Sequence, residues 1–160
     1  MTLYEQINSD MLHAMKEHEK ETLSTIRLLK SAIDLQKINS KLSEITDELV
    51  IEVASRQVKQ HKESIEEFRN ANRDDLADAL VKEIEVISRY LPKQLTEEEI
   101  ESEIDKIFEE INPTGKQDMG KIMKEANTRL KGKADFKLVS EIVNKKLDMW
   151  VSFFLVIWYH

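Results

Sequence analysis

The scarcity of turn-forming residues is the feature that most constrains how this chain can fold. Its 160 residues include three Gly and two Pro, the residue types that are strongest at interrupting regular structure. Long helices joined by a few short links therefore fit the chain better than a sheet with many turns. Apolar residues make up 41% of the chain, which is enough for a packed core, and 34% are charged, against about 25% in an average globular protein.

Apolar residues recur at three- and four-residue steps in seven segments, which predicts helices and no strand before the last dozen residues. Two segments open with a Thr-x-x-Glu capping box, at Thr2–Glu5 and Thr96–Glu99. Pro92 ends the fourth segment, because a residue before proline avoids helical backbone angles. We therefore expect an all-α protein, with an N-terminal helical bundle of about four helices in residues 1–92 and a C-terminal three-helix module in residues 96–148. The expected caps of the fourth, sixth and seventh helices are Asp74 or its neighbour, Asp118 and Asp135.

The residue types needed for most catalytic chemistry are missing. The chain has no Cys, which excludes thiolate nucleophiles and cysteine-ligated metal sites. His13 and His18 are five residues apart and do not share a helix face as zinc ligands do, and His61 lies on the apolar stripe of its helix. Neither a nucleotide-binding glycine loop nor a nucleophile motif is present. The sequence therefore predicts no catalytic residue, no metal ligand and no cofactor.

The charge of the chain is unevenly distributed. The net charge of −7 argues against non-specific binding to nucleic acid, DNA included. Between Lys116 and Lys146, however, nine basic residues stand against four acidic ones, a net of +5, and the remaining 15 basic and 27 acidic residues give −12. This asymmetry predicts one surface that faces a polyanion on a body that otherwise repels it.

A predicted turn holds the most suggestive basic residues. Lys131 and Lys133 flank Gly132, and Gly lets the backbone approach a ligand closely. Lysines on a turn neutralise phosphates without reading base sequence. Because Phe136 is the only aromatic residue nearby, the stretch favours phosphate contacts on folded RNA over base stacking on single strands. The alternative is an ordinary solvated face whose lysines complement helix C-termini.

Residues 150–160 differ in composition from the rest of the chain. Nine of the eleven are apolar, and they hold five of the ten aromatic residues, both Trp included. A helix of this length reaches about 16 Å against a hydrocarbon core of roughly 30 Å, so we expect no transmembrane segment. Three interpretations remain: a tail that packs on the body or self-associates, a docking or interfacial membrane anchor, or a strand for pairing.

Several motifs resemble the GatB/YqeY family. The most specific is Tyr90-Leu-Pro-Lys-Gln-Leu95 after a long helix, and Lys131-Gly-Lys-Ala-Asp135 supports it. Arg27-Leu-Leu-Lys30 and Asp118-Met-Gly-Lys121 also match. The resemblance covers about residues 1–148. Where the family has Gly after Ala-Asp, this chain has Phe136, and the apolar tail at 149–160 lies outside the pattern.

The resemblance implies a function in tRNA-dependent transamidation. A similar domain ends the B subunit of the tRNA-dependent amidotransferase, where it contacts tRNA while ATP-dependent activation and amide transfer occur elsewhere. We therefore expect a YqeY-like accessory protein that binds tRNA, with a protein partner in a tRNA-processing complex. The family label of carbon–nitrogen ligase with glutamine as amido donor comes with this resemblance, but we expect no catalysis by the chain alone. The alternative is a helical protein–protein interaction module with no RNA role.

The same resemblance, together with the charge pattern, selects the residues expected at phosphates. The primary set is Lys121, Arg129, Lys131 and Lys133, and the secondary set is Lys116, Lys124 and Lys137. Arg27 and Lys30 match family positions in the N-terminal bundle and are expected to serve the same surface. Because Met1–Asp10 lacks the basic and apolar runs of a secretion signal, a cytoplasmic protein is expected.

Overall fold

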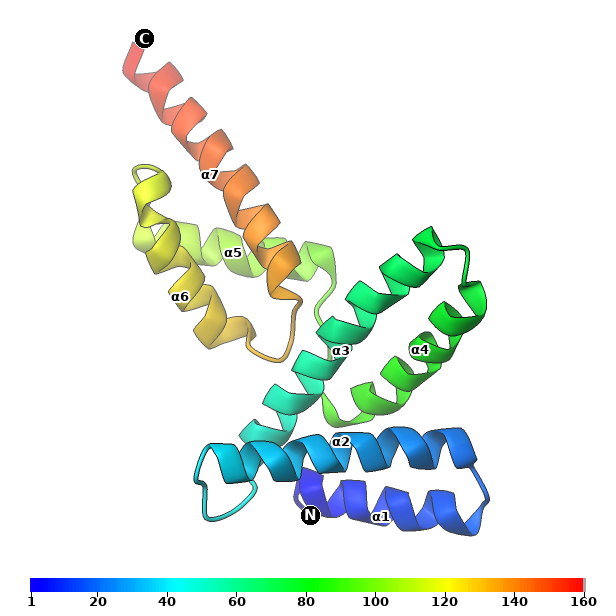
Figure 1. The fold of residues 1–160 in the computed structure, drawn as a ribbon. Coiled ribbons are helices and arrows are strands. Elements are labelled where there is room, and N and C mark those ends of the chain that lie inside the picture. The colour runs from blue at the N-terminus through cyan, green and yellow to red at the C-terminus, as the bar shows by residue number, and fades with distance from the viewer. Residues whose placement is uncertain (160) are drawn as a thin grey trace. The chain divides into compact units, whose positions relative to one another are not determined.

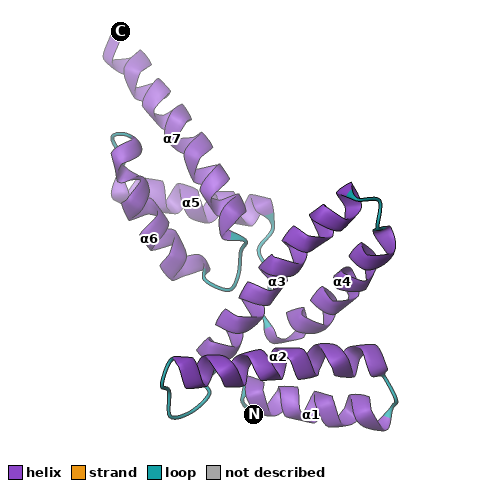
Figure 2. Ribbon diagram, in the orientation of Figure 1, coloured by secondary structure: helices purple, strands orange, loops and turns teal. Residues whose placement is uncertain are grey.

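The computed structural model describes residues 1–159, apart from the side chain of Phe154, so His160 at the end of the tail lies outside the described residues. Over that range it contains helices and loops and no strand (Figures 1 and 2), which confirms the prediction of an all-α protein. The α-helices are α1 (Leu3–Lys16), α2 (Lys20–Asn39), α3 (Asp47–Asn70), α4 (Asp74–Ile87), α5 (Glu97–Ile111), α6 (Met119–Leu130) and α7 (Phe136–Tyr159). Two short 3-10 turns are η1 (Ser88–Tyr90) and η2 (Lys116–Asp118).

The chain divides into two compact units, each with its own apolar core. Unit 1 runs from Met1 to Pro92 and contains α1 to α4, and unit 2 begins at Lys93 and contains α5 to α7. No helix among the described residues is long and apolar enough to cross a membrane.

The core of unit 1 forms where the apolar stripes of its helices meet. Ile7 of α1, Ile33 of α2, Val50 of α3 and Ile87 of α4 are buried, all at 1% exposure or less. The fixed phase of a helix explains this, since residues three and four apart share one face.

Side-chain caps mark the starts of two of the four α-helices in unit 1. Thr2 and Glu5 form the predicted reciprocal capping box of α1, and the Thr46 hydroxyl accepts the Leu49 N–H at the start of α3. The prediction for α4 is wrong as far as Asp74 is concerned. Arg73 occupies the cap position without a side-chain hydrogen bond, and the Asp74 carboxylate bonds Arg69 instead.

Two phenol–carboxylate hydrogen bonds tie α1 to the rest of unit 1. The Tyr4 hydroxyl donates to Asp34 at 2.7 Å, and the Tyr90 hydroxyl donates to Asp10 at 2.6 Å. Burial, with the hydrogen bond and charge of Asp34, raises the pKa of Tyr4 to about 12. Burial and Asp10 likewise raise the pKa of Tyr90. Both phenols therefore remain protonated donors at neutral pH.

Unit 2 packs the inner faces of three helices together. Its core includes Ile104 and Phe108 of α5, Ile122 of α6, and Val143 and Leu147 of α7. The Thr96 hydroxyl accepts the Glu99 N–H at 3.2 Å at the start of α5, as the capping-box pattern predicts. Asn112 ends α5 in a left-handed conformation, with φ of 56°, which Asn tolerates better than most residues.

Helix α7 continues through the apolar tail. We call Phe136–Asp148 its proximal half and Met149–Tyr159 its distal half. The proximal half packs in the core of unit 2, whereas the distal half is helical but largely exposed. The interpretation of the tail as a strand is therefore wrong over the described residues. Packing on the body is limited in this half, where the Trp150 ring meets Phe108 edge-on at 5.8 Å between centroids.

Candidate nucleic-acid interface

The turn between α6 and α7 is held by hydrogen bonds from the segment that precedes α5. The Leu95 N–H donates to the Lys133 carbonyl at 2.9 Å, and the Gln94 side-chain amide donates to the Gly132 carbonyl at 2.7 Å. The Lys133 N–H also bonds back to the Leu130 carbonyl. A segment far away in the sequence thus fixes the backbone of this turn.

Gly132 gives the turn its sharp bend. Its φ is 78°, in the left-handed region where a side chain is strained and Gly is not. Beyond it, the Asp135 carboxylate accepts the Lys137 N–H at 3.0 Å and caps α7, as expected. Phe136, which replaces the Gly of the family pattern, has no positive φ and packs half-buried against the core of unit 2. The turn therefore does not require Gly at that position.

Five lysines surround this turn and leave their charges exposed. We call Lys121, Lys124, Lys131, Lys133 and Lys137 the basic surface; all five are exposed. Lys121 and Lys124 lie on one side of α6, at a spacing of three residues. No ion pair between described residues involves any of the five lysines.

The charge of Lys137 is not explained by helix stability. It lies in the first turn of α7, where the helix dipole favours negative side chains and disfavours positive ones. Lys131 and Lys133, in contrast, follow the C-terminus of α6, where a cation is favourable. The lysine in the first turn of α7 is thus the better indicator of a binding role.

Arg129 differs from the lysines because carboxylates already surround it. Its guanidinium bonds Glu125 on its own helix at 2.9 Å and Glu110 on α5. The hydrogen bonds that Arg129 donates to the carboxylates of Glu110 and Glu125 raise its pKa. The side chain is 27% exposed, and its guanidinium group links α6 to α5.

Lys116 is likewise engaged. Its ammonium lies 3.3 Å from the carboxylate of Asp148, at the border between the two halves of α7. The neighbouring Asp118 precedes α6 but makes no side-chain cap bond to it, contrary to expectation. Its carboxylate instead accepts the Thr114 N–H, which precedes it in the chain, at 2.8 Å. This bond, aided by the Thr114 hydroxyl and Lys121, lowers the pKa of Asp118.

Arg27 and Lys30, the two phosphate contacts predicted outside the C-terminal module, lie on α2 in unit 1. Arg27 is exposed beside a shallow hollow of about 340 Å³ that Leu23 and Leu28 also line. The Lys30 ammonium lies 5.8 Å from the centroid of the Tyr4 ring, within the range of a cation–π contact.

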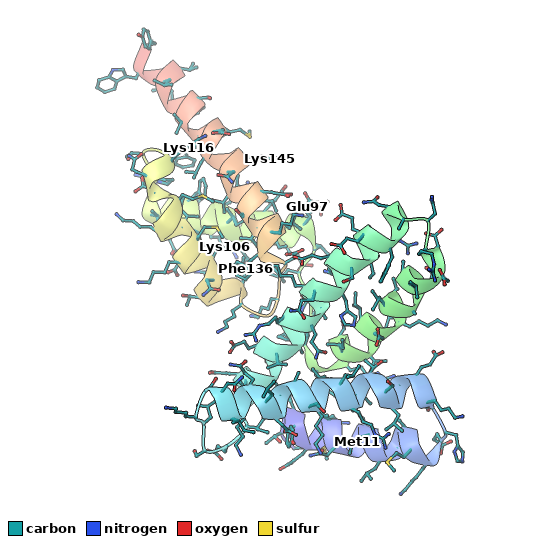
Figure 3. The ribbon with its side chains drawn as sticks, viewed as in Figure 1. Met11, Glu97, Lys106, Lys116, Phe136 and Lys145 are labelled. Atoms are coloured by element: carbon teal, nitrogen blue, oxygen red, sulfur yellow. The ribbon has the colours of Figure 1, made fainter. Side chains whose placement is uncertain are left out.

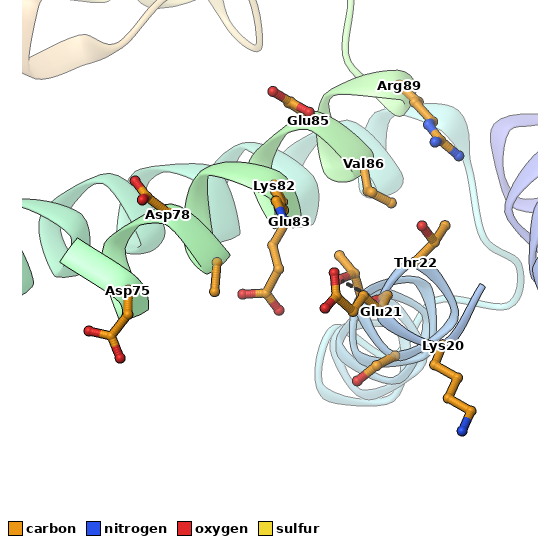
Figure 4. Close-up of a pocket in the computed structure, with 13 residues that line it drawn as sticks. Lys20, Glu21, Thr22, Asp75, Asp78, Lys82, Glu83, Glu85, Val86 and Arg89 are labelled. Atoms are coloured by element: carbon orange, nitrogen blue, oxygen red, sulfur yellow. Dashed lines mark hydrogen bonds between the residues drawn. The ribbon is translucent and has the colours of Figure 1, made fainter. Parts of the chain in front are cut away.

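A larger hollow between α2 and α4 was not indicated by the sequence. It has a volume of about 830 Å³ (Figure 4) and is lined by both acids and bases, among them Glu21, Asp78, Lys82 and Arg89. Each of its lining residues is of a type expected on the solvent-exposed face of a helix, so no sequence motif predicts the hollow. The described residues contain no group of three side chains that could hold a metal ion, and His61 pairs with Glu83 at 3.4 Å.

Comparison with known proteins relates the chain to one family. The family described as Yqey-like protein matches residues 4–147. A protein of Pyrenophora tritici-repentis named altered inheritance of mitochondria protein 41, mitochondrial, is 30% identical over 89% of this chain and 77% of its own length. An uncharacterized protein of Schizosaccharomyces pombe is 33% identical over 54% of this chain and 70% of its own. A protein of Lachancea thermotolerans with the same name as the first is 30% identical over 66% of this chain and 57% of its own.

These comparisons correct the predicted compartment and define which residues the family match covers. The expectation of a cytoplasmic protein is wrong, because two of these relatives are named as mitochondrial proteins. The expectation rested on the composition of Met1–Asp10, which does not distinguish one compartment inside a cell from another. The family match ends at residue 147, so the distal half of α7 lies outside it.

Proposed function

This chain belongs to the YqeY-like protein family, and from that premise we propose that it binds tRNA through the basic surface of unit 2. Binding is to phosphates on the folded RNA and not to particular bases. The protein acts as an accessory in tRNA-dependent transamidation, with a protein partner that supplies the chemistry. The names of its relatives point to the mitochondrion as the compartment in which to test this.

The observation that carries the proposal is the group of unpaired lysines on a fixed turn. Lys131, Lys133 and Lys137 are exposed without ion-pair partners, and hydrogen bonds from Leu95 and Gln94 hold the backbone between them. A fixed turn loses little conformational freedom when it binds, so more of the phosphate attraction is retained as affinity.

Within the proposal, the predicted residues have different roles. Lys121, Lys124, Lys131, Lys133 and Lys137 contact phosphates. Arg129 positions α6 against α5, because Glu110 and Glu125 already engage two of its three guanidinium nitrogens. Lys116 belongs to the Asp148 ion pair, and Arg27 and Lys30 contribute from unit 1.

The test is the salt dependence of tRNA binding by the full chain, followed by fluorescence anisotropy of labelled tRNA. Each phosphate contact makes the slope of log K against log salt more negative by about 0.7–0.9. We expect a slope of about −3 or steeper for the unaltered protein, flattened by roughly 2 in Lys131→Glu/Lys133→Glu. Duplex DNA should bind more weakly than tRNA.

The matched control is Lys59→Glu/Lys62→Glu on α3, which changes the net charge equally at exposed positions of unit 1. It should leave both affinity and slope close to those of the unaltered chain. Equal losses in the two variants would mean that total charge governs binding, and the proposed surface would be wrong. Glutamine-dependent amide transfer by the chain alone would contradict the accessory role.

A second candidate function is a protein-interaction module based on unit 1. Leu28, Leu35 and Ile38 are 58% to 71% exposed on α2, and their spacing of seven and three residues puts them on one face of the helix. A partner helix could bury that face. This candidate predicts partner binding that survives changes in the basic surface and is lost on Leu28→Asp/Leu35→Asp.

A further inference from the structure

The distal half of α7 is apolar around its whole circumference. Its exposed large apolar side chains are 55% to 87% accessible: Met149, Phe153, Leu155, Val156, Ile157, Trp158 and Tyr159. At 100° per residue, these positions are spread over every side of the helix and do not form one stripe. Figure 1 shows this end of α7 extending beyond α5 and α6 of its own unit.

The angular distribution selects between kinds of partner. A groove on a protein, or one helix of a second copy, covers a single face and leaves the opposite side chains in water. Hydrocarbon surrounds a helix evenly and removes apolar surface on every side. We propose that the distal half of α7 inserts into the surface layer of a lipid bilayer and anchors the protein there.

The polar groups of the segment are compatible with such an environment. No Asp, Glu, Lys or Arg occurs from Met149 to Tyr159. The hydroxyl of Ser152, the one non-aromatic polar side chain in this stretch, donates to the Asp148 carbonyl at 2.8 Å. The segment is about 16 Å long, roughly the depth of one leaflet, which agrees with an anchor that does not cross the membrane.

The border of the segment is suited to lipid headgroups. Asp148 is the last acidic residue before it, and Lys116 from η2 neutralises that carboxylate at 3.3 Å. Lys145 is exposed one turn earlier on α7, and Figure 3 shows Lys116 and Lys145 at this level of unit 2. Lys146 lies beside them in an ion pair with Asp105. With three lysines against two aspartates, the border is slightly basic and favours anionic headgroups.

The test is binding of the full chain to phosphatidylcholine vesicles that contain a minority of phosphatidylglycerol. Both Trp residues lie on α7, and Trp158 is 87% exposed, so intrinsic fluorescence reports on this helix directly. We expect the protein to float with the vesicles and its emission to shift to shorter wavelength. Ile157→Asp should reduce partition by about tenfold or more, because an aspartate is costly in hydrocarbon.

Leu12→Asp on α1 is the matched control. Leu12 is 54% exposed and Ile157 is 60% exposed, so both substitutions add one charge at an exposed aliphatic side chain without disturbing a core. Leu12→Asp should bind vesicles like the unaltered chain. Equal binding by Ile157→Asp would overturn the proposal. So would a chain that ignores vesicles but forms a dimer lost in Ile157→Asp, since a second copy would then be the partner.

Discussion

The two halves of α7 form one continuous helix but are in opposite environments. The proximal half carries all of the charged residues of α7, yet it buries Val139, Ile142, Val143 and Leu147 at 5% exposure or less. The distal half carries none of those charges and leaves most of its described large apolar side chains exposed, although Trp150 packs against Phe108. The more polar half of the helix is therefore the one that is packed.

The difference shows that the pattern of apolar residues governs burial more than their number. The apolar residues of the proximal half recur at steps of three and four residues and face the complementary stripes of α5 and α6. The distal half has no such stripe and extends past the helices that cover the first half. Within this unit, an apolar segment is buried only where another element faces it.

The largest difference in stability is expected between a charged substitution in the proximal half and one in the distal half. Val143 is fully buried, so Val143→Asp should unfold unit 2, at a cost of more than about 4 kcal/mol. Ile157→Asp should leave folding intact because its side chain already meets solvent. Thermal melts followed by circular dichroism measure both, and a folded unit 2 in Val143→Asp would contradict the packing described above.

Cavity formation gives a second, smaller contrast. Leu147 is 1% exposed and Leu155 is 55% exposed. Leu147→Ala should lower the free energy of unfolding by about 2–5 kcal/mol, whereas Leu155→Ala should change it by less than about 0.5 kcal/mol. Urea titrations of the two variants test this, and similar losses in both would mean that the distal half packs in solution.

The turn that starts the proximal half offers a third test. Gly132→Ala should destabilise unit 2 by about 1 kcal/mol, because alanine is strained at its φ of 78°. Gly120→Ala is the control: a Cβ there meets no atom within 4 Å, and alanine favours the helix by up to about 1 kcal/mol. Opposite signs in urea titration are expected, and a shared sign would contradict the role of Gly132.

The smallest effect is expected at the border between the halves. Lys116 and Asp148 are 74% and 63% exposed, and such surface pairs contribute at most a few tenths of a kcal/mol. Asp148→Asn should therefore change unfolding by less than about 0.5 kcal/mol, while vesicle binding is retained or strengthened. A large loss of stability would show that this pair, and not the apolar core, holds α7 in place.

Local interactions explain the parts of the fold that were predicted from sequence. The capping box at Thr2 and the hydroxyl cap at Thr96 act within one helical turn, as does Asp135 at α7, so the residue pattern alone identifies those helix starts. Asp74 and Asp118 failed as predicted caps because nearby groups compete for their carboxylates, Arg69 in one case and Thr114 in the other.

The candidate interface was predictable only in part, for the same reason. The excess of lysines between Lys116 and Lys146 is visible in the sequence. Which of these charges are free is not, because Glu110 on α5 occupies Arg129 and Asp148 on α7 occupies Lys116. The hollow between α2 and α4 also had no sequence signal, since it arises from how the two helices face one another.

The helices, the family and the basic stretch could be predicted from the sequence, because periodicity, capping and charge are properties of neighbouring residues. Which lysines remain unpaired and which half of α7 is buried depended on how the helices pack. Those outcomes depend on groups that are distant in the chain: Gln94 and Leu95 hold the turn around Gly132, while, within the described part of unit 2, the side chains of the distal half beyond Val151 are exposed. Burial and ion pairing require a partner in space, and the packed structure identifies that partner.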